Sequence, residues 1–324
     1  MLLQDQIDWV DLDTDWLDFM KAVSVDTIHL ETRGYAGVEG HELNISKGKI
    51  PAELFEQARE KIEAKGMKLN NVFYSCPREI PLGLAGADEG IEIWCRLLES
   101  LGQGGIPALG WNYKPMGNFR TPKTIGRGSA GYSTFDYDLF MQNRPQLYCP
   151  EVTEEEMWER MESFMRAVIP VAEKAGVTMA LHPDDPPVPE PLGGVAQVCS
   201  TTAQFRRIFD SVPSHHHRML FCQGCMTELL GQGVYDFIAE MASNNKIQWV
   251  HFRNVRGQLP HFEEVFMDEG DIDMKRAMEV YRDNGFNGPF MMDHTPQFQS
   301  GDSARSGKAY ANGYIRRLIE EVYG

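Results

Sequence analysis

Short apolar runs and amphipathic segments alternate along most of the chain. The apolar runs predict buried strands, and the segments with a helical period between them predict amphipathic helices. The expected strands cover residues 7–10, 27–31, 68–73, 106–111, 178–181, 218–221, 247–250 and 289–292. The expected helices cover residues 14–22, 51–65, 87–101, 154–175, 202–211, 234–243, 273–284 and 308–323. Eight such strand–helix units predict an α/β fold, a single-domain TIM (β/α)8 barrel over residues 1–324.

One long stretch interrupts this alternation between the fourth strand and the next helix. Residues 112–150 contain glycines, prolines and aromatic residues but show no clear period, which predicts a long lid-like loop. A doubly wound parallel sheet is the alternative to the barrel. Such a sheet normally has a glycine-rich phosphate turn after its first strand, and the segment IDWVDLDTD contains none. The pattern therefore favours the barrel.

Four of the apolar runs end on a side chain that binds metals. These side chains are His182 in MALHPDDPP, Cys222 in MLFCQGC, His251 in WVHFRN and Asp293 in FMMDH. The carboxyl ends of barrel strands surround the active site, so these side chains should meet at one point. Two imidazoles, a thiolate and a carboxylate suit Zn, Fe(II), Co or Mn better than Mg or Ca, and ligand chemistry alone favours zinc. A lone histidine at a strand end is more often structural, but the fourfold recurrence predicts a metal site.

Acidic residues outnumber basic ones, with 47 Asp and Glu against 31 Lys and Arg and a formal net charge of −16. A nucleic-acid-binding protein needs a basic surface, so we expect no nucleic-acid partner. No apolar run approaches the roughly 20 residues that span a bilayer, and the first residues lack the basic and apolar regions of a signal peptide. We expect a cytoplasmic protein without membrane contact. Apolar positions on the outer helices favour a homo-oligomer, a dimer or higher.

The six cysteines are expected to be reduced thiols, because a long chain without a secretion signal has no need of a disulfide frame. Cys222 and Cys225 form a C-x-x-C, a spacing that also occurs in redox pairs and in half of a structural zinc site. A redox pair normally opens a helix that lowers its thiol pKa, and no second C-x-x-C is present. We interpret Cys225 as a small buried residue.

Charged neighbours of the predicted ligands are candidates for binding and proton transfer. His294 follows Asp293 directly and can serve in acid–base chemistry. Arg253 shares a strand face with His251, where it would clamp a carboxylate or hydroxyl near the metal or hold a loop by ion pairing. Asp184 and Asp185 lie in the proline-locked loop after His182. They would orient a ligand and bind substrate hydroxyls, or form a rigid polar turn.

Longer segments around these side chains resemble the D-mannonate dehydratase family, which has a xylose isomerase-like TIM barrel. The resemblance covers residues 80–324. It rests on LHPDDPP (181–187), the Cys-x-Gly of FCQGC, HFRNV (251–255), HFEEVFMDEGDIDM (261–274), the Asp-His of MMDH, and the segments 80–115 and 167–183. The resemblance implies one divalent ion, with Mn2+ first and Fe2+, Co2+, Zn2+ or Mg2+ as alternatives. The residues matching the family ligands are His182, Cys222, His251 and Asp293.

The resemblance also implies a lyase that removes water from an aldonic acid such as D-mannonate and leaves a 2-keto-3-deoxy sugar acid. A C–H bond beside a carboxylate is a weak acid, so the metal would stabilise charge on the enediolate that forms. A base and an acid must flank the ion, and His294 is our first choice for one of them. We expect Asn112, Arg120 and His261 to contact the sugar acid, with a supporting role as the alternative for His261.

Two departures from the family pattern bear on the substrate. Family members typically place an arginine two residues before the Asp-His pair, where this chain has Met291. They also carry a catalytic tyrosine after that pair, and we expect Lys308 or Tyr310 to replace it. The chain therefore resembles a divergent member. The alternatives to a dehydratase are a metal-dependent isomerase, epimerase or non-hydrolytic lyase acting on a sugar or keto-sugar, and a non-catalytic sugar-acid-binding barrel.

Overall fold

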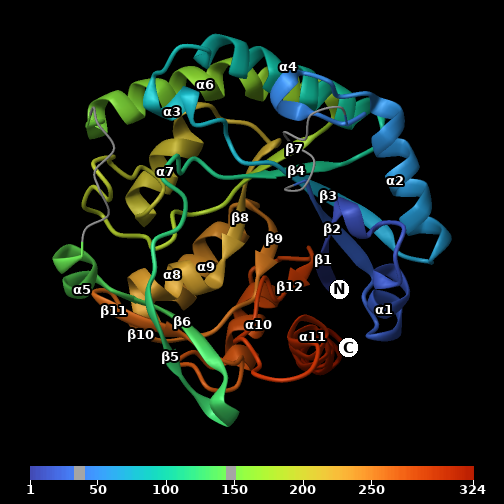
Figure 1. Cartoon of the computed structure of the whole chain (residues 1–324), viewed down its shortest axis with the longest axis vertical. Helices are drawn as coiled ribbons and strands as arrows, with labels where there is room; N and C mark the ends of the chain where they lie inside the picture. Colours follow the sequence, from blue (N-terminus) through green and yellow to red (C-terminus); the bar gives the residue numbers. More distant parts are fainter. Residues whose placement is uncertain (33–40, 144–150) are drawn as a thin grey trace.

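Eight parallel strands form the central sheet of the computed structural model, which describes residues 1–32, 41–143 and 151–324 (Figure 1). A parallel bridge between Leu3 and Phe290 joins the first strand to the last, so the sheet closes and the predicted TIM barrel is confirmed. The strands follow one another in the order β1 (Gln4–Asp8), β2 (Thr27–Glu31), β3 (Lys68–Phe73), β4 (Ala108–Trp111), β7 (Thr178–Leu181), β8 (His217–Cys222), β9 (Ile247–His251) and β12 (Phe290–Met291).

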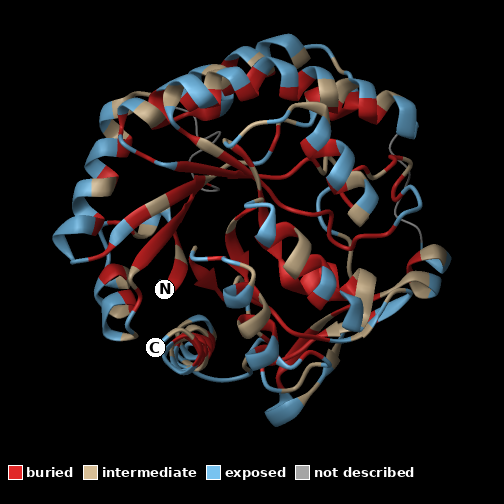
Figure 2. Ribbon diagram, turned by 180° about the vertical axis from the view of Figure 1, so that it is seen from behind, coloured by how far each residue is buried: buried red, intermediate tan, exposed pale blue. Residues whose placement is uncertain are grey.

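Helices surround the barrel, and Figure 2 shows buried surfaces facing the strands and exposed surfaces facing away. Three of them, α6, α7 and α9, have the bounds expected from the sequence. Capping boxes at Thr153 and Thr201 explain why the starts of α6 and α7 were predictable. The main helices are α1 (Trp16–Ala22), α2 (Ala52–Ala64), α4 (Ala87–Gln103), α6 (Glu154–Ala175), α7 (Thr202–Ser211), α9 (Val234–Ser243), α10 (Met274–Asp283) and α11 (Ser303–Tyr323). Short helices also occur at α3 (Glu79–Leu82) and α8 (Gln223–Leu230).

The prediction that residues 112–150 form a loop without regular structure was wrong. This lid contains strands β5 (Thr121–Ile125) and β6 (Gly131–Asp136), followed by helix α5 (Tyr137–Gln142). Strand β6 pairs with β11 (His261–Glu264), which pairs with β10 (Val255–Gln258), so an antiparallel sheet of order β10-β11-β6-β5 covers one side of the barrel mouth. Phe135 and Phe262 pack together beneath this sheet. Residues 144–150 of the predicted lid, with Cys149, lie outside the described residues.

A layer of buried side chains fills the barrel just below its carboxyl end. Side chains two apart in a strand point to the same face, so each ligand candidate stands directly above this layer. Gly110 is part of this packing, because a Cβ there would lie 2.7 Å from Phe73 and 2.9 Å from Trp249. The layer consists of Ala108, Ala180, Leu220, Trp249 and Met291, and the last four each lie two residues before a predicted ligand.

Two further features concern the cysteines and the helices of the described chain. Cys76, Cys95, Cys199, Cys222 and Cys225 are all free thiols. None of the helices in the described ranges combines the length and the apolar character that a membrane span requires.

The histidine run 215–217 lies at the start of β8, at the opposite end of the barrel from the ligand candidates. Within this run, His217 is fully buried. Its ring packs edge-on against Phe209 at a centroid distance of 5.1 Å, and its Nδ1 lies 3.3 Å from the carbonyl oxygen of Val212. Burial lowers the pKa of His217 to about 4, so the imidazole is neutral in the folded protein.

The buried His217 should make the protein lose stability in mild acid. The unfolded chain takes up a proton on this histidine near its ordinary pKa of 6.5, whereas the folded protein does so only at about 4. Stability is therefore lost as the pH falls between these values, by about 2 kcal/mol between roughly pH 7 and pH 4.5. Urea unfolding of His217→Gln should show a correspondingly smaller loss over this range. The exposed His215, replaced in the same way, should leave the wild-type pH dependence unchanged.

Candidate active site

The four predicted ligands meet at the carboxyl end of the barrel. Cys222 and His251 end strands β8 and β9, and His182 and Asp293 follow β7 and β12 by one and two residues. One ligand atom from each of the four lies within 4.8 Å of the other three. His182, Cys222 and His251 are buried, and Asp293 is partly exposed. The structure thus brings the four side chains together in the arrangement that the strand ends predict.

Local backbone features aim two of these side chains. The His182 Nδ1 lies 2.7 Å from the carbonyl oxygen of Pro183. A carbonyl can only accept, so Nδ1 carries a proton, and Nε2 is the ring nitrogen left to face a metal. Asp293 has a φ of 68°, a left-handed conformation that is uncommon for a residue with a side chain. This conformation occurs two residues after β12, and the carboxylate lies beside His251, whose Nδ1 is 3.4 Å from Asp293 Oδ2.

The electrostatics of the four side chains fit a divalent cation. Burial disfavours the Cys222 thiolate, but Cys225, Arg253 and the two histidines lower the pKa of Cys222 well below its usual value. Burial likewise lowers the pKa of His251, but Asp293 and Cys222 outweigh it and raise that pKa to about 9. The His251 ring thus lies between two anionic side chains, with its Nδ1 3.4 Å from Asp293 Oδ2. The negative charge that favours a proton on this imidazole would equally favour a divalent cation held by the four side chains.

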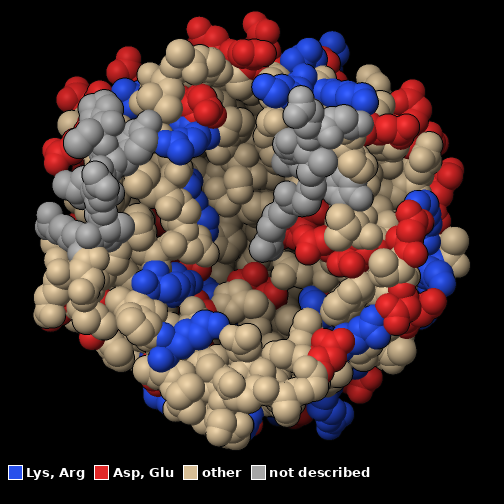
Figure 3. Space-filling model, in the orientation of Figure 1, with Lys and Arg blue, Asp and Glu red and all other residues tan. Residues whose placement is uncertain are grey.

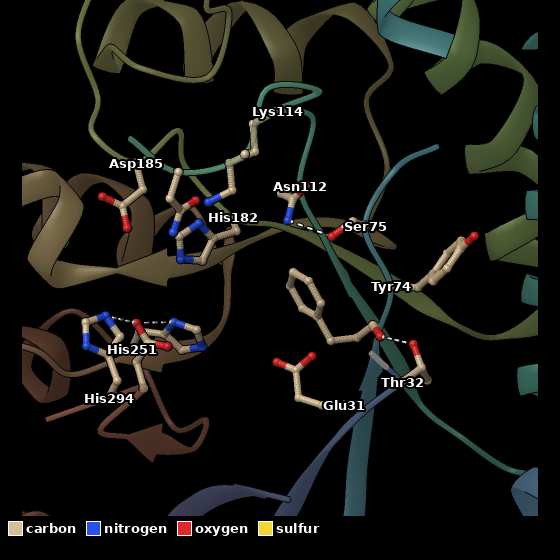
Figure 4. Close-up of a pocket in the computed structure, with 14 residues that line it drawn as sticks. Glu31, Thr32, Tyr74, Ser75, Asn112, Lys114, His182, Asp185, His251 and His294 are labelled. Carbon is tan, nitrogen blue, oxygen red and sulfur yellow. Dashed lines mark hydrogen bonds and ion pairs between the residues drawn. The ribbon is translucent and has the colours of Figure 1, made fainter. Parts of the chain in front are cut away.

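A cavity of about 430 Å³ opens above the four side chains. Figure 4 shows its walls, and Figure 3 shows the same face of the molecule hollowed near its centre, with basic side chains along one side. A cavity of this size suits a small, largely enclosed ligand. Its described lining residues are Glu31, Thr32, Phe73, Tyr74, Ser75, Asn112, Lys114, Gly117, Asn118, His182, Asp185, His251, Asp293 and His294.

His294 lies on the cavity wall beside Asp293, as predicted. Its Nε2 lies 2.7 Å from Arg253 Nη1, and its Nδ1 lies 3.4 Å from Glu264 Oε2. An arginine can only donate, so Nε2 is the acceptor in the first contact. These contacts hold the ring from two sides, and the side chain is still 44% exposed. His294 can therefore reach a ligand in the cavity.

Arg253 lies behind the wall and is only 2% exposed. It donates to Glu264 at 2.5 Å and to Glu228 at 3.2 Å, and it lies 3.5 Å from the Cys222 sulfur. Gly224 makes room for it, because a Cβ there would clash with the guanidinium, which explains the glycine of the Cys-x-Gly motif. Arg253 does not line the cavity. It holds protein carboxylates in place, which is the ion-pairing alternative stated from the sequence.

A second group of possible metal ligands, Asp185, Cys225 and Glu228, lies beside the first. Arg253 contacts all three, at 3.7 Å, 3.3 Å and 3.2 Å. The guanidinium therefore already supplies the positive charge at that position. The buried C-x-x-C partner Cys225 fits its predicted role as a small core residue.

Only some of the expected substrate-binding residues line the cavity. Asn112 and Asp185 line the cavity, and Asn112 donates to Ser75 Oγ at 3.1 Å. Asp184 is buried away from it and accepts from the backbone of Cys199, so it forms the rigid polar turn instead. Arg120 is paired with Asp185 at 2.6 Å and with Glu264 at 2.5 Å and does not line the cavity. It locks the lid to the barrel.

Three further predicted site residues also lie away from the cavity. His261 is 56% exposed and pairs with Asp136 across the lid sheet, because in β11 it alternates with the buried Phe262. Lys308 lies inside helix α11, which begins at Ser303 and not at residue 308 as expected. Its Nζ lies 2.6 Å from the fully buried Asp5 of β1. The Tyr310 hydroxyl donates to Asp268 at 2.6 Å. These three residues are therefore not placed to contact a ligand bound at the four-residue site.

Two charged residues of the cavity wall, Glu31 and Lys114, were not predicted from the sequence. Glu31 ends strand β2, and its Oε1 lies 3.2 Å from His29 Nε2, while Asn71 donates to His29 Nδ1 at 2.8 Å. This chain of contacts orients the carboxylate. Lys114 follows β4 by three residues. Both positions were recognisable as polar residues at or just after a barrel strand, the same signal that found the four ligands.

Comparison with known proteins gives consistent results. The family model for D-mannonate dehydratase matches residues 139–322. The mannonate dehydratase of Lactococcus lactis subsp. cremoris is 27% identical over 338 residues, covering 89% of this chain and 92% of that protein. Among solved structures, the mannonate dehydratase of Streptococcus suis serotype 2 matches with a TM-score of 0.82 at 22% identity, covering 99% and 93%. An L-ribulose 3-epimerase shares the fold, with a TM-score of 0.64 at 13% identity and coverage of 99% and 95%.

Proposed function

The chain belongs to the D-mannonate dehydratase family, and we propose that it removes water from a D-mannonate-like sugar acid to give a 2-keto-3-deoxy sugar acid. Sugar-acid dehydration by a lyase is the reaction class of this family. The observation that supports the proposal is the convergence of His182, Cys222, His251 and Asp293 under a cavity whose wall carries His294. A pure binding protein would have no need of a buried thiolate and a neighbouring acid–base residue.

We propose that these four side chains hold one divalent ion, with Mn2+ first and Fe2+, Co2+, Zn2+ or Mg2+ as alternatives. When bound, the ion would supply positive charge that stabilises the negative charge formed as the C–H bond beside the substrate carboxylate breaks. Held by these four side chains, that charge would lie at the floor of the cavity. The anionic Asp293 and Cys222 would hold the cation, together with Nε2 of His182 and the His251 ring.

Removal of water requires one group to take a proton from carbon and another to give a proton to the leaving hydroxyl. We propose His294 for one transfer, because it borders the cavity beside Asp293 and its ring is oriented by Arg253 and Glu264. Glu31 is the proposed partner. Its carboxylate points into the same cavity from strand β2, held by His29 (Figure 4). Lys308 and Tyr310 are not proposed, because their side chains are paired elsewhere.

The direct test is to give manganese-loaded protein D-mannonate and to measure formation of a 2-keto-3-deoxy acid. We expect turnover at ordinary enzyme rates, about 1 per second or faster. No product from protein that retains its metal would contradict the proposal. A rearranged sugar would then identify an isomerase or epimerase, and binding without any conversion would identify a sugar-acid-binding barrel.

Removing the thiolate should weaken metal binding specifically. We expect Cys222→Ala to bind Mn2+ at least about 10- to 100-fold more weakly, because even outer contacts of a metal ligand contribute this much. Cys95→Ala, on helix α4, should bind it as the wild type does. Equilibrium dialysis against Mn2+ measures both. An equally large loss in Cys225→Ala would instead indicate a metal site built on both thiols of the C-x-x-C.

A further inference from the structure

We propose that Lys114 binds the carboxylate of the substrate and thereby makes the cavity selective for sugar acids over uncharged sugars. The inference rests on the proposed function, since it names the residue that recognises the acid group in the same cavity. Lys114 would also supply a positive charge near the metal site, where the arginine typical of the family is replaced by Met291.

Buried neighbours and a backbone turn fix the position of Lys114 at the cavity rim. It lies three residues beyond the end of β4, directly after the buried Asn112 and Tyr113. Its carbonyl oxygen accepts from the backbone of Gly117 at 3.0 Å, which closes a turn. Figure 4 shows its side chain reaching from this turn toward His182, above the four-residue site. The ammonium is thus directed into the cavity rather than into solvent.

Its charge is not used by the protein itself. Among the described lining residues, Lys114 is the only lysine or arginine, beside the acids Glu31, Asp185 and Asp293. Its ammonium has no hydrogen-bond or ion-pair partner in the part of the chain that the structure describes. Arg120 and Arg253, by contrast, are paired with carboxylates.

The nearest carboxylates already have other partners. Lys114 lies close enough to favour the charged forms of Asp184 and Asp185. Asp185, however, is bound by Arg120 at 2.6 Å, and Asp184 accepts from the Cys199 backbone at 2.8 Å. A lysine needed to neutralise them would contact one of them directly. The free ammonium is instead suited to an anion that enters from outside.

The surroundings indicate which anion this is. Thr32, Ser75 and Asn112 line the same cavity and can exchange hydrogen bonds with hydroxyl groups. A ligand with one carboxylate and a chain of hydroxyls matches this distribution, and a sugar acid is such a ligand. The compact ammonium with three donors contributes a charge-assisted hydrogen bond that an uncharged sugar cannot make.

The test compares an acid with its uncharged counterpart under conditions without turnover. A 3-deoxy aldonate keeps the carboxylate but has no 3-hydroxyl to lose, and the matching 3-deoxy alditol lacks the charge. Calorimetry on manganese-loaded protein gives both affinities. We expect Lys114→Met to bind the acid roughly 10- to 100-fold more weakly and the alditol within about twofold of wild type. Lys114→Arg should recover part of the acid affinity.

The matched control is Lys123→Met, which removes an exposed lysine of the lid that contacts Gln297 outside the cavity. It should change neither affinity, and metal content should be equal in all variants. Unchanged acid binding in Lys114→Met, or an equal loss for acid and alditol, would overturn the inference. Acid binding that depends on Lys114 in a protein that forms no product from D-mannonate would leave the inference standing and reject the dehydratase.

Discussion

Replacing His294 by alanine should lower kcat for D-mannonate by about 100- to 10,000-fold while the protein keeps its metal. The imidazole borders the cavity and is oriented by Arg253 and Glu264, so its loss removes a proton-transfer group without removing a ligand. The measurement combines steady-state kinetics with metal analysis of the same samples. A loss confined to KM would show a binding role instead.

The matched control is His261→Ala. This histidine also lies in a family-like segment, but its side chain is exposed and pairs with Asp136 outside the cavity. We expect near wild-type kcat. If His294→Ala lost its metal along with its activity, the residue would have to be counted with the ligands. If both histidine variants kept full activity, proton transfer would have to be assigned to other groups, with Glu31 next to be replaced.

The four ligand positions were predictable because they follow from strand geometry alone. A residue at the carboxyl end of a parallel barrel strand points to the mouth when the residue two before it points to the interior. Trp249 and His251 show this relation on β9, and Leu220 and Cys222 show it on β8. Hydrophobic patterning locates such strands without knowledge of any tertiary contact.

The lid was not predictable in this way, because its structure depends on contacts between distant segments. Strand β6 pairs with β11, which lies far along the chain after β9, and Phe135 packs against Phe262 of that strand. The same non-local pairing exposes His261. Lys308 was misplaced because its partner Asp5 lies on the first strand, next to the end of the chain in the closed barrel. The local sequence around each residue does not reveal these pairings between distant segments.

Replacing Arg253 by methionine should destabilise the protein by about 3–5 kcal/mol. The guanidinium is buried and its nearest carboxylates, Glu264 and Glu228, are 3% and 0% exposed. Methionine keeps much of the volume but removes the hydrogen bonds that both acids accept from Arg253, and it leaves Arg120 as the arginine paired with Glu264. Urea unfolding in the presence of a chelator measures the effect, since the chelator prevents loss of metal from contributing to it.

An arginine on the lid surface provides the control for the charge pairing itself. Arg127 binds Asp268 at 2.7 Å, but the two side chains are 45% and 38% exposed, so water replaces the lost contact and Arg127→Met should cost only about 0–1 kcal/mol. Adding Glu264→Gln to Arg253→Met should recover part of the lost stability, because it removes a buried carboxylate that has lost one of its two arginine partners. If Arg253→Met were no more costly than Arg127→Met, the buried acids would have to be neutral in the folded protein. Arg253 would then act by hydrogen bonding to Glu264 and His294 and not by neutralising a buried carboxylate.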